Sequence, residues 1–142
     1  MVTQISVFLP NRPNQLSKVT QILMKERINI RALTVSETAD YGILRMIVSD
    51  PEKAQKVLQG SFLVDQTDVI ACELKDKPGG LYEIAKILGD ASINIEYLYA
   101  FVGKSAQAIL ILRVENQMQA KAIDVLVGNN ITIFPPEQIY GL

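Results

Sequence analysis

Alternating apolar and polar residues open the chain. Apolar residues occupy every second position of 4–9, which predicts a strand with one buried face. From Pro13 onward the apolar spacing lengthens to three and four residues, which predicts an amphipathic helix with the proline in its first turn. Residues 28–36 again have strand character, and their apolar phase shifts at Ala32 and Leu33, as it does at a β-bulge.

The next runs complete an order of six elements. A turn around Ala39 leads into a third strand at 43–48. Asp50 is suited to a helix N-cap and is followed by a proline and an acid, which predicts a second helix that Gly60 closes. A fourth short strand follows at 62–64. This strand-helix-strand-strand-helix-strand order is that of the ferredoxin-like βαββαβ module.

The second half of the chain repeats this order. The first strand, the first helix and the start of the second strand recur 65 residues later, and one insertion makes the spacing 66 from the third strand onward. The matched positions are Ile5 with Ile70, Val7 with Cys72, Leu9 with Leu74, Pro13 with Pro78, Leu16 with Leu81, Ile28 with Ile93, and Ile43 with Ile109. Matches spread over so many elements predict an internal duplication. We therefore expect an α+β protein of two tandem ferredoxin-like modules, 1–66 and 67–142, each with an antiparallel sheet and both helices on one face.

Two features near the C-terminus belong to the second repeat alone. Asn116 and Gln119 form a capping pair for its last helix, since Asn can accept an amide of the first turn while Gln reaches back. After Pro135 and Pro136 the chain ends in 138–142, whose spacing resembles the start of the second repeat. A short edge strand is expected there, and a docked or frayed tail is the alternative.

The connection between the repeats contains no Gly, Ser or Pro linker. Only Asp65–Asp68 interrupts the apolar residues around it, so a fixed arrangement of the two modules is expected. Each third strand also carries apolar residues on both faces, at Ile43 and Ile47 in the first repeat and at Ile109 and Ile111 in the second. An uncovered apolar face promotes aggregation. Contact between the repeats or a homodimer is therefore expected to cover it.

Composition narrows the classes of partner. Hydrophobic residues make up 49% and charged residues 20% of the 142 residues, which is typical of a folded globular protein. The net charge of -1 and the pI of about 5.4 leave no excess of Lys and Arg for a phosphate backbone or an anionic membrane. No apolar run reaches the length of a membrane span, and the N-terminus lacks the basic and apolar regions of a signal peptide. We expect neither nucleic acid nor membrane as a partner, and a cytoplasmic location.

The counts of histidine and cysteine exclude several kinds of catalytic and metal-binding site. There is no histidine and a single cysteine, Cys72, which excludes disulfides within the chain, thiolate zinc sites and nucleophiles that need an imidazole. Cys72 lies in phase with Ile70 and Leu74 on one strand face, which indicates a buried thiol. Glu83 and Asp90 are spaced for the solvated face of a helix and not as a catalytic pair. The sequence therefore predicts no catalytic residue, no metal and no cofactor.

The junction between the first strand and first helix of each repeat carries the candidate chemistry. The second repeat has Asp76-Lys77-Pro78-Gly79-Gly80-Leu81 where the first has Asn11-Arg12-Pro13-Asn14-Gln15-Leu16. Glycines at a helix start leave backbone N–H groups approachable, and a helix N-terminus favours an anion such as a carboxylate. Asp76 can accept from an ammonium group, and Asn94 at the second strand offers donors and an acceptor. A carboxylate together with an ammonium group describes a free amino acid.

At these residues the chain resembles the ACT domain family, small βαββαβ regulatory modules that bind amino acids. The resemblance covers essentially the whole chain as two tandem copies. It implies an amino acid effector at an interface between two modules, held by the turn before the first helix and by the second strand of a neighbour. We therefore expect a stand-alone regulatory module that acts as a homodimer or through a partner metabolic enzyme. Asn11 and Asn29 are similar to the paired asparagines of a serine-binding ACT domain, and Asp76 and Asn94 take those positions in the second repeat.

The predicted ligand-binding residues come from both junctions and both second strands. They are Asp76, Lys77, Gly79, Gly80, Leu81 and Asn94 in the second repeat, and Asn11, Asn14, Gln15 and Asn29 in the first. Asn14 replaces the glycine that the family has at this position, and its side chain crowds the turn. We therefore expect the second repeat to be the better site.

Three other functions compete with amino acid binding. The chain could be a structural or protein-interaction module that regulates a partner enzyme without a ligand. RRM domains share the βαββαβ order, but both third strands lack the stacking aromatics of an RRM and the net charge is unsuitable. An enzyme on this fold is the weakest interpretation, because the chain offers no acid-base pair.

Overall fold

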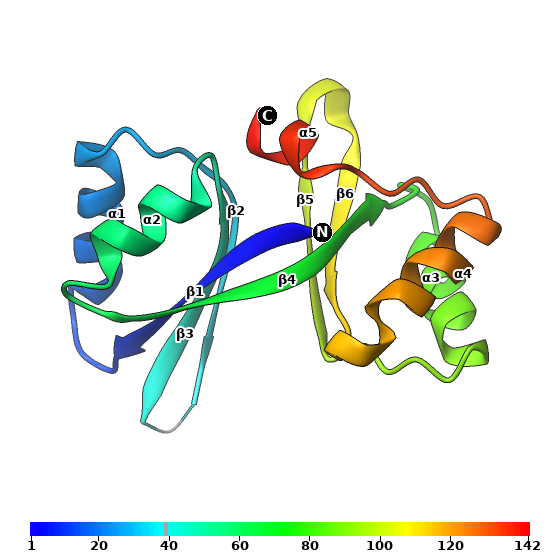
Figure 1. Ribbon diagram of the computed structural model, residues 1–142, viewed down its shortest axis with the longest axis horizontal. Helices are drawn as coiled ribbons and strands as arrows, with labels where there is room; N and C mark the ends of the chain where they lie inside the picture. Colours follow the sequence, from blue (N-terminus) through cyan, green and yellow to red (C-terminus); the bar gives the residue numbers. More distant parts are fainter. Residues whose placement is uncertain (39) are drawn as a thin grey trace. The chain divides into compact units, whose positions relative to one another are not determined.

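The chain forms two compact units, and each end of the chain belongs to the unit built by the opposite half. The N-terminal unit comprises Thr3–Thr67 and Tyr140–Leu142, and the C-terminal unit comprises Met1–Val2 and Asp68–Ile139. The computed structural model describes residues 1–38 and 40–142, so the turn predicted around Ala39 falls at a residue outside the described part. Figure 1 shows the course of the chain.

A four-stranded antiparallel sheet underlies the N-terminal unit. Its neighbouring strands follow the order β2-β3-β1-β4. The elements are β1 (Val2–Pro10), α1 (Gln15–Lys25), β2 (Ile30–Glu37), β3 (Tyr41–Val48), α2 (Pro51–Leu58) and β4 (Leu63–Glu73). The register of β2 against β3 shifts between Ile30 and Ala32, which confirms the predicted β-bulge.

Both helices of the N-terminal unit lie on the same side of its strands (Figure 1). They enclose a core that includes Ile5, Val7 and Leu9 of β1. The inward stripe of α1 is Gln15, Val19 and Leu23, which are four residues apart and so share one face. Leu16 points off this stripe and is 42% exposed, although its spacing is that of the apolar residues of the predicted helix.

The start of α1 also differs from the prediction. The helix begins at Gln15 with Asn14 as its N-cap residue, so Pro13 precedes the cap and does not occupy the first turn. The predicted cap of α2 is confirmed, because the Lys53 amide donates to Asp50 Oδ1 at 3.1 Å and Pro51 follows directly.

The C-terminal unit has the strand order β4-β6-β5, so the fourth strand of its predicted βαββαβ order is not formed by the residues that the structure describes. Its elements are α3 (Gly80–Asp90), β5 (Tyr97–Val102), β6 (Ala108–Arg113), α4 (Gln119–Gly128) and α5 (Pro136–Tyr140). Figure 1 shows α3 and α4 together on one side of β5 and β6. Ile133 forms an isolated bridge with Cys72 on β4. A second core forms between these helices and strands, and Ile70, Cys72, Ile84 and Leu110 belong to it.

The strand β4 merges two predicted strands. Residues 62–64 and 69–74 were expected to be separate, but an unbroken strand of 11 residues runs through Asp65–Asp68. These polar residues disfavour burial, yet none of them is a Gly or Pro that would break an extended backbone. The boundary between the two units therefore falls inside a strand.

The last residues of the chain form a helix, so the predicted edge strand was wrong. Pro136 begins α5, where its fixed φ and missing N–H suit a first turn, and Ile139 is fully buried. Within the N-terminal unit, the Thr3 amide donates to the Tyr140 hydroxyl at 2.8 Å and Arg31 Nε donates to the Tyr140 carbonyl at 2.9 Å. The alternative of a docked tail is therefore confirmed.

The predicted capping pair of the last helix was also wrong. Asn116 Oδ1 accepts from Gln119 Nε2 at 3.1 Å and from Arg113 at 2.9 Å. A short 3-10 turn, Asn116–Met118, precedes α4, which has no side-chain cap. The nearby arginine competes for the oxygen that the capping rule assigns to the helix amides.

Both faces of the third strands are covered within the single chain at three of the four predicted positions. Ile47, Ile109 and Ile111 are at most 2% exposed, and Ile43 is half-buried. A second copy is therefore not needed to shield Ile47, Ile109 and Ile111. Cys72 is buried as predicted, and this burial, with the charge of Glu73 second, raises the pKa of its thiol to about 12.

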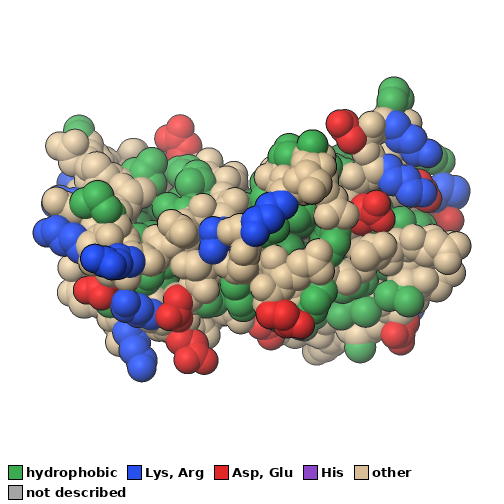
Figure 2. All heavy atoms as spheres, turned by 90° about the horizontal axis from the view of Figure 1, so that it is seen from above, with side chains coloured by type: hydrophobic (Ala, Val, Ile, Leu, Met, Phe, Trp, Pro, Cys, Tyr) green, Lys and Arg blue, Asp and Glu red, His purple; other side chains and the backbone are tan. Residues whose placement is uncertain are grey.

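The surface mixes both signs of charge. On the face seen in Figure 2, Lys and Arg side chains lie among Asp and Glu side chains and patches of hydrophobic atoms. Across residues 1–38 and 40–142, no helix combines the length and the apolar character needed to cross a bilayer.

Candidate functional site

The two strand-helix junctions share one backbone conformation. Asn14 has φ 69° and Gly79 has φ 89°, and each is the N-cap residue of its helix without a side-chain cap bond. Asn is one of the few residues with a side chain that tolerates the left-handed region. The duplication is therefore preserved in the backbone even where the residue type has changed.

The two junctions differ at the next position, which is Gly80 in the C-terminal unit and Gln15 in the N-terminal unit. A Cβ atom on Gly80 would lie 2.1 Å from the carbonyl oxygen of Lys75, so a side chain is incompatible with this path. The Gly80 amide donates to the Lys77 carbonyl at 3.0 Å and closes a tight loop. Gln15 takes this place in the N-terminal unit, and its Cβ requires a wider separation there.

A hollow of about 350 Å³ lies beside the junction of the N-terminal unit. It is lined by Leu9, Pro10, Asn11, Arg12, Asn14, Gln15, Leu16, Val35, Glu37 and Gly42. Three of the predicted ligand-binding residues, Asn11, Asn14 and Gln15, thus meet at one place. We call it the amino acid hollow, after the ligand class that the sequence predicted.

The sequence analysis missed two charged residues of the amino acid hollow. Arg12 comes from the junction and Glu37 ends β2, and neither forms an ion pair with any residue that the structure describes. Arg12 is part of the repeated motif and could have been included for that reason. Glu37 could not, because only the pairing of β2 and β3 brings the end of β2 to the junction.

Gln15 adds a buried polar group to the same hollow. It is 6% exposed, and its side-chain amide has no hydrogen-bond partner among the described residues. No side-chain nitrogen or oxygen of the described residues is fully buried without a partner, so water or a ligand can reach the Gln15 amide. The hollow therefore combines a cation, a carboxylate and an amide that can still bond.

Asn29 lies away from this hollow. The backbone amide of Asn29 donates to Ser49 Oγ at 2.9 Å, and its backbone carbonyl accepts from the Ser49 backbone amide at 2.9 Å. Asn29 therefore flanks the start of β2. The hollow is reached at the far end of β2, where Glu37 pairs with Gly42. The 11 residues of α1 span about 16 Å. One module alone does not bring Asn29 to Asn11.

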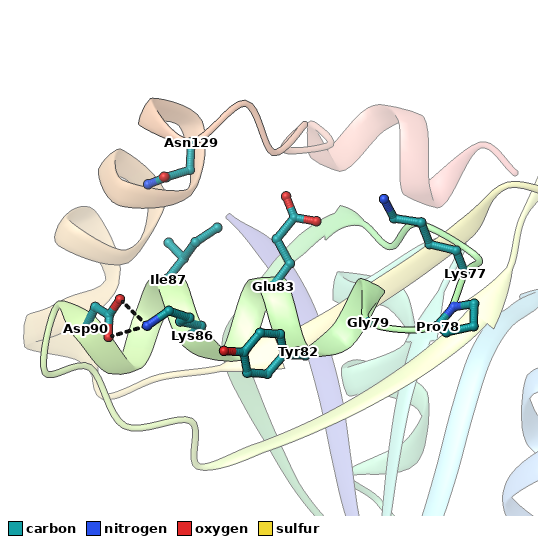
Figure 3. Close-up of a pocket in the computed structure, with 9 residues that line it drawn as sticks. All are labelled: Lys77, Pro78, Gly79, Tyr82, Glu83, Lys86, Ile87, Asp90 and Asn129. Carbon is teal, nitrogen blue, oxygen red and sulfur yellow. Dashed lines mark hydrogen bonds and ion pairs between the residues drawn. The ribbon is translucent and has the colours of Figure 1, made fainter.

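The C-terminal unit has a hollow of about 660 Å³ along α3. Figure 3 shows five lining residues on that helix, with Lys77, Pro78 and Gly79 in the turn before it and Asn129 at the end of α4. Of the predicted residues, Lys77 and Gly79 line it, whereas Asp76, Gly80, Leu81 and Asn94 do not. Three of its charged residues are already paired, since Lys86 contacts Asp90 at 3.1 Å and Glu83 contacts Lys75 at 3.7 Å.

Of the remaining predicted residues of the C-terminal unit, Gly80 is buried and the other three are exposed. Asp76 lies in the junction turn, and Leu81 is 43% exposed at the start of α3. Asn94 is exposed and lies before β5, which begins only at Tyr97. As in the N-terminal unit, the helix of 11 residues separates the junction from the residue before the second strand.

Comparisons with known proteins agree with this architecture. A family model described as an ACT domain pair matches residues 1–140. Protein BT0572 from Bacteroides thetaiotaomicron is 38% identical, with a TM-score of 0.90 over 99% of this chain and 96% of its own. The regulatory subunit of aspartate kinase from Thermus thermophilus, in its ligand-free form, is 15% identical, with a TM-score of 0.63 over 89% of this chain and 91% of its own. No curated protein matches the chain.

These comparisons differ in what they establish. An identity of 15% shows that the aspartate kinase subunit shares the fold and nothing more. The family model spans both repeats, and BT0572 is similar from end to end. The chain therefore belongs to the ACT domain family, as a pair of ferredoxin-like modules.

Proposed function

We propose that this ACT domain pair binds a free α-amino acid and regulates a partner, without catalysing a reaction itself. The amino acid hollow is the observation that carries the proposal. Arg12 is placed to hold a carboxylate and Glu37 an ammonium group, while Gln15 can donate or accept. A zwitterion satisfies both charges at once, which a simple anion or a simple cation cannot do.

A second copy of the chain is proposed to complete the site. In the N-terminal unit, β2 stands at the end of the strand order, and its Leu33 and Val35 are 47% and 48% exposed. An exposed apolar edge strand favours pairing with another chain. Since Val35 and Glu37 of β2 also line the hollow, pairing there would close it and bring Asn29 of the second copy within reach.

The C-terminal unit is proposed as a second, different site. Asp76 and Lys77 supply an acid and a cation within its junction, whereas Val102 stands where the N-terminal unit has Glu37. The sequence ranked this site first because Asn14 was expected to crowd the other turn. Asn14 adopts the same left-handed conformation as Gly79 and lines an open hollow, so that reason no longer favours either unit. The ranking itself stays a prediction.

The regulated partner is proposed to be a metabolic enzyme. Modules of the ACT family are regulatory, and a protein with the same fold is the regulatory subunit of aspartate kinase. A ligand that closes the contact between two copies can change which surface a partner meets. A protein-interaction module that needs no ligand is the competing function.

A thermal-shift screen against the free amino acids tests the proposal directly. A ligand at about 100 times its dissociation constant adds about 2.7 kcal/mol to the free energy of unfolding. We expect one amino acid, or a few related ones, to raise the melting temperature at millimolar concentration. If none of them shifts it while the protein still self-associates, the ligand-free interaction module becomes the better description.

Calorimetry on variants then locates the site. Glu37→Gln and Arg12→Gln should each weaken binding at least tenfold if the N-terminal unit holds the ligand, and Lys56→Gln on α2 serves as a charge-changing control. If the sequence ranking is right, Asp76→Ala and Asn94→Ala should weaken binding more than Asn11→Ala and Asn29→Ala. Equal or reversed effects would contradict that ranking.

A further inference from the structure

A second hollow lies beside the same junction of the N-terminal unit, along α1. Its volume is about 310 Å³. It is lined by Pro10, Arg12, Gln15, Lys18, Gln21, Ile22, Ser61 and Phe62. We call it the anion hollow. Arg12 and Gln15 line both this hollow and the amino acid hollow, so these two side chains lie between the two.

The lining of the anion hollow is cationic. It contains the charges of Arg12 and Lys18 and no Asp or Glu. Neither cation forms an ion pair within residues 1–38 and 40–142. Gln21 and Ser61 add further hydrogen-bond donors. Two uncompensated cations in one concave site favour an anion.

Gln15 provides the independent observation. Its side chain is 6% exposed yet has no hydrogen-bond partner in the described part of the chain. No side-chain nitrogen or oxygen of the described residues is fully buried without a partner, so the Gln15 amide is still accessible and free to bond to water or to a ligand. Because Gln15 lines the hollow, a bound group there can accept from its amide nitrogen.

The duplication supplies a contrast inside the same molecule. The C-terminal unit has Glu83 at the position of Lys18, and Lys86 at that of Gln21. Glu83 is paired with Lys75 at 3.7 Å, and Lys86 is paired with Asp90 at 3.1 Å. The corresponding hollow of the C-terminal unit is thus balanced in charge, and its Gly80 has no side chain where Gln15 is buried. The excess of cations belongs to the N-terminal unit alone.

We propose that the anion hollow binds a small molecule that carries a phosphate group. Two cations match the double charge of a phosphate monoester better than the single charge of a carboxylate, and the arginine fork suits phosphate geometry. Pro10, Ile22 and Phe62 offer apolar contact to the organic part of the molecule. Since Arg12 and Gln15 line both hollows, the phosphate compound competes with the amino acid for the same side chains.

Phenyl phosphate is a suitable probe, and amide chemical shifts of the nitrogen-15-labelled full chain are the readout. The titration is done without any amino acid, so its result is independent of the proposed amino acid site. We expect saturable shifts at Arg12, Gln15, Lys18 and Ser61, and binding at least tenfold weaker to benzoate of the same ring size. Raising the salt concentration should weaken the phosphate complex.

Two matched variants decide between a specific site and general charge. Lys18→Glu installs the residue of the C-terminal unit and should weaken phenyl phosphate binding at least tenfold, whereas Lys56→Glu makes the same charge change outside the lining and should leave it within twofold. Amide shifts away from residue 18 report that the variant is folded. Equal weakening by both variants, shifts spread over lysines of both units, or benzoate binding as tightly as phenyl phosphate would each overturn the proposal.

Discussion

At Gly80, the junction of the C-terminal unit cannot accept a side chain, although the N-terminal unit has Gln15 at the matching position. An added Cβ would lie 2.1 Å from Lys75 O, a backbone atom that cannot rotate away. We expect Gly80→Ala to lower the free energy of unfolding by about 1–3 kcal/mol, as overpacking of a close contact does. Urea denaturation followed by circular dichroism measures this change.

Gly89 provides the matched control in the same helix. A Cβ added there meets nothing within 4 Å, and alanine favours a helix over glycine by up to about 1 kcal/mol. Gly89→Ala should therefore be neutral or stabilising. If both substitutions have the same effect, the close approach at Gly80 does not limit this turn.

The buried thiol of Cys72 is expected to make the stability of the fold fall at alkaline pH. Burial raises the pKa of its thiol to about 12, from 9.0 in the unfolded chain. Between these values the unfolded state loses a proton that the folded state keeps, so stability falls as pH rises, by up to about 1.4 kcal/mol per pH unit. Below pH 9 the thiol makes no pH-dependent contribution.

Comparison with Cys72→Ala isolates this effect from the titration of Tyr and Lys. The free energy of unfolding of the wild type should fall more steeply above pH 9 than that of the variant, although the variant is less stable at pH 7 because of the lost side chain. Parallel pH profiles would show that the thiol is less buried than the structure has it.

At the scale of single residues, the sequence predicted which residues lie close together better than it predicted which way their side chains point. Asn11, Asn14 and Gln15 meet at one hollow as the repeated motif indicated. Leu16 and Leu81 look like core residues by their spacing, yet both are over 40% exposed. The phase of a helix depends on where it starts, and neither Pro13 nor Pro78 marks that start.

At the scale of elements, the sequence predicted the helices and strands that the two modules share. It failed at the fourth strand of the second module, where only the bridge of Ile133 with Cys72 forms, and where one repeat meets another part of the chain. Asp65–Asp68 looks like an interruption, but it lies inside β4. Residues 138–142 look like a strand by their spacing, yet Pro136 starts a helix. In both places the local pattern is compatible with two structures, and contacts distant in sequence select one.

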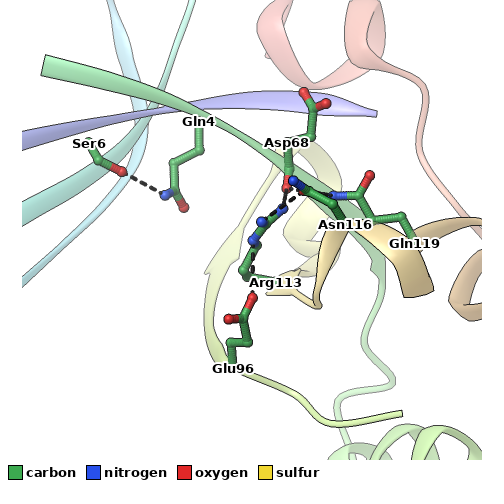
Figure 4. A network of polar contacts seen from close by, with 7 residues as sticks. All are labelled: Gln4, Ser6, Asp68, Glu96, Arg113, Asn116 and Gln119. Carbon is green, nitrogen blue, oxygen red and sulfur yellow. Dashed lines mark hydrogen bonds and ion pairs between the residues drawn. The ribbon is translucent and has the colours of Figure 1, made fainter.

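Also at the scale of elements, Arg113 joins several segments of the C-terminal unit, and the repeat pattern does not predict these contacts. It stands where the first repeat has Ile47, and Figure 4 shows its guanidinium among the groups it joins. It donates to Asp68 O at 2.8 Å and to Asn116 Oδ1 at 2.9 Å, and it contacts Glu96 at 3.3 Å. One side chain thus ties β4, the segment before β5 and the turn before α4 to the end of β6.

Replacing Arg113 should therefore destabilise the C-terminal unit. Its side chain is only 15% exposed, and Arg113→Met removes two hydrogen bonds from a charged donor, each worth about 1.5–3 kcal/mol. Because both hydrogen bonds are exposed, we expect less than their sum, a loss of about 2–4 kcal/mol in urea denaturation. Glu96 is 46% exposed, so Glu96→Gln should cost less than about 1 kcal/mol. Equal losses would mean that the ion pair, and not the hydrogen bonds, is the stabilising contact.

At the scale of the whole molecule, each half of the sequence contributes its end to the unit built by the other half. Met1–Val2 belong to the C-terminal unit and Tyr140–Leu142 to the N-terminal unit. The repeat pattern could not predict this exchange, because both segments lie outside the matched elements. The sequence did locate both halves of a candidate site, but the geometry of one module keeps Asn11 and Asn29 at opposite ends of α1.

Mixing two inactive variants tests whether a second copy completes the amino acid hollow. Asn11→Ala and Asn29→Ala should each reduce binding when every site in a dimer combines one mutated and one intact residue. In a symmetric dimer formed from one copy of each variant, one site carries both substitutions and the other carries neither. Co-refolding the two variants should therefore restore wild-type affinity at a fraction of the sites, up to about one per mixed dimer.

The restored fraction is measured by calorimetry with the amino acid identified in the thermal-shift screen. Co-refolding Asn11→Ala with an Asn11→Ala, Asn29→Ala double variant is the control, because no mixed dimer of that pair contains an intact site. Recovery in the first mixture alone places Asn11 and Asn29 of different copies in one site. Equal binding by both mixtures would contradict a shared site, and the N-terminal unit of a single copy would then have to hold the ligand with Arg12, Gln15 and Glu37.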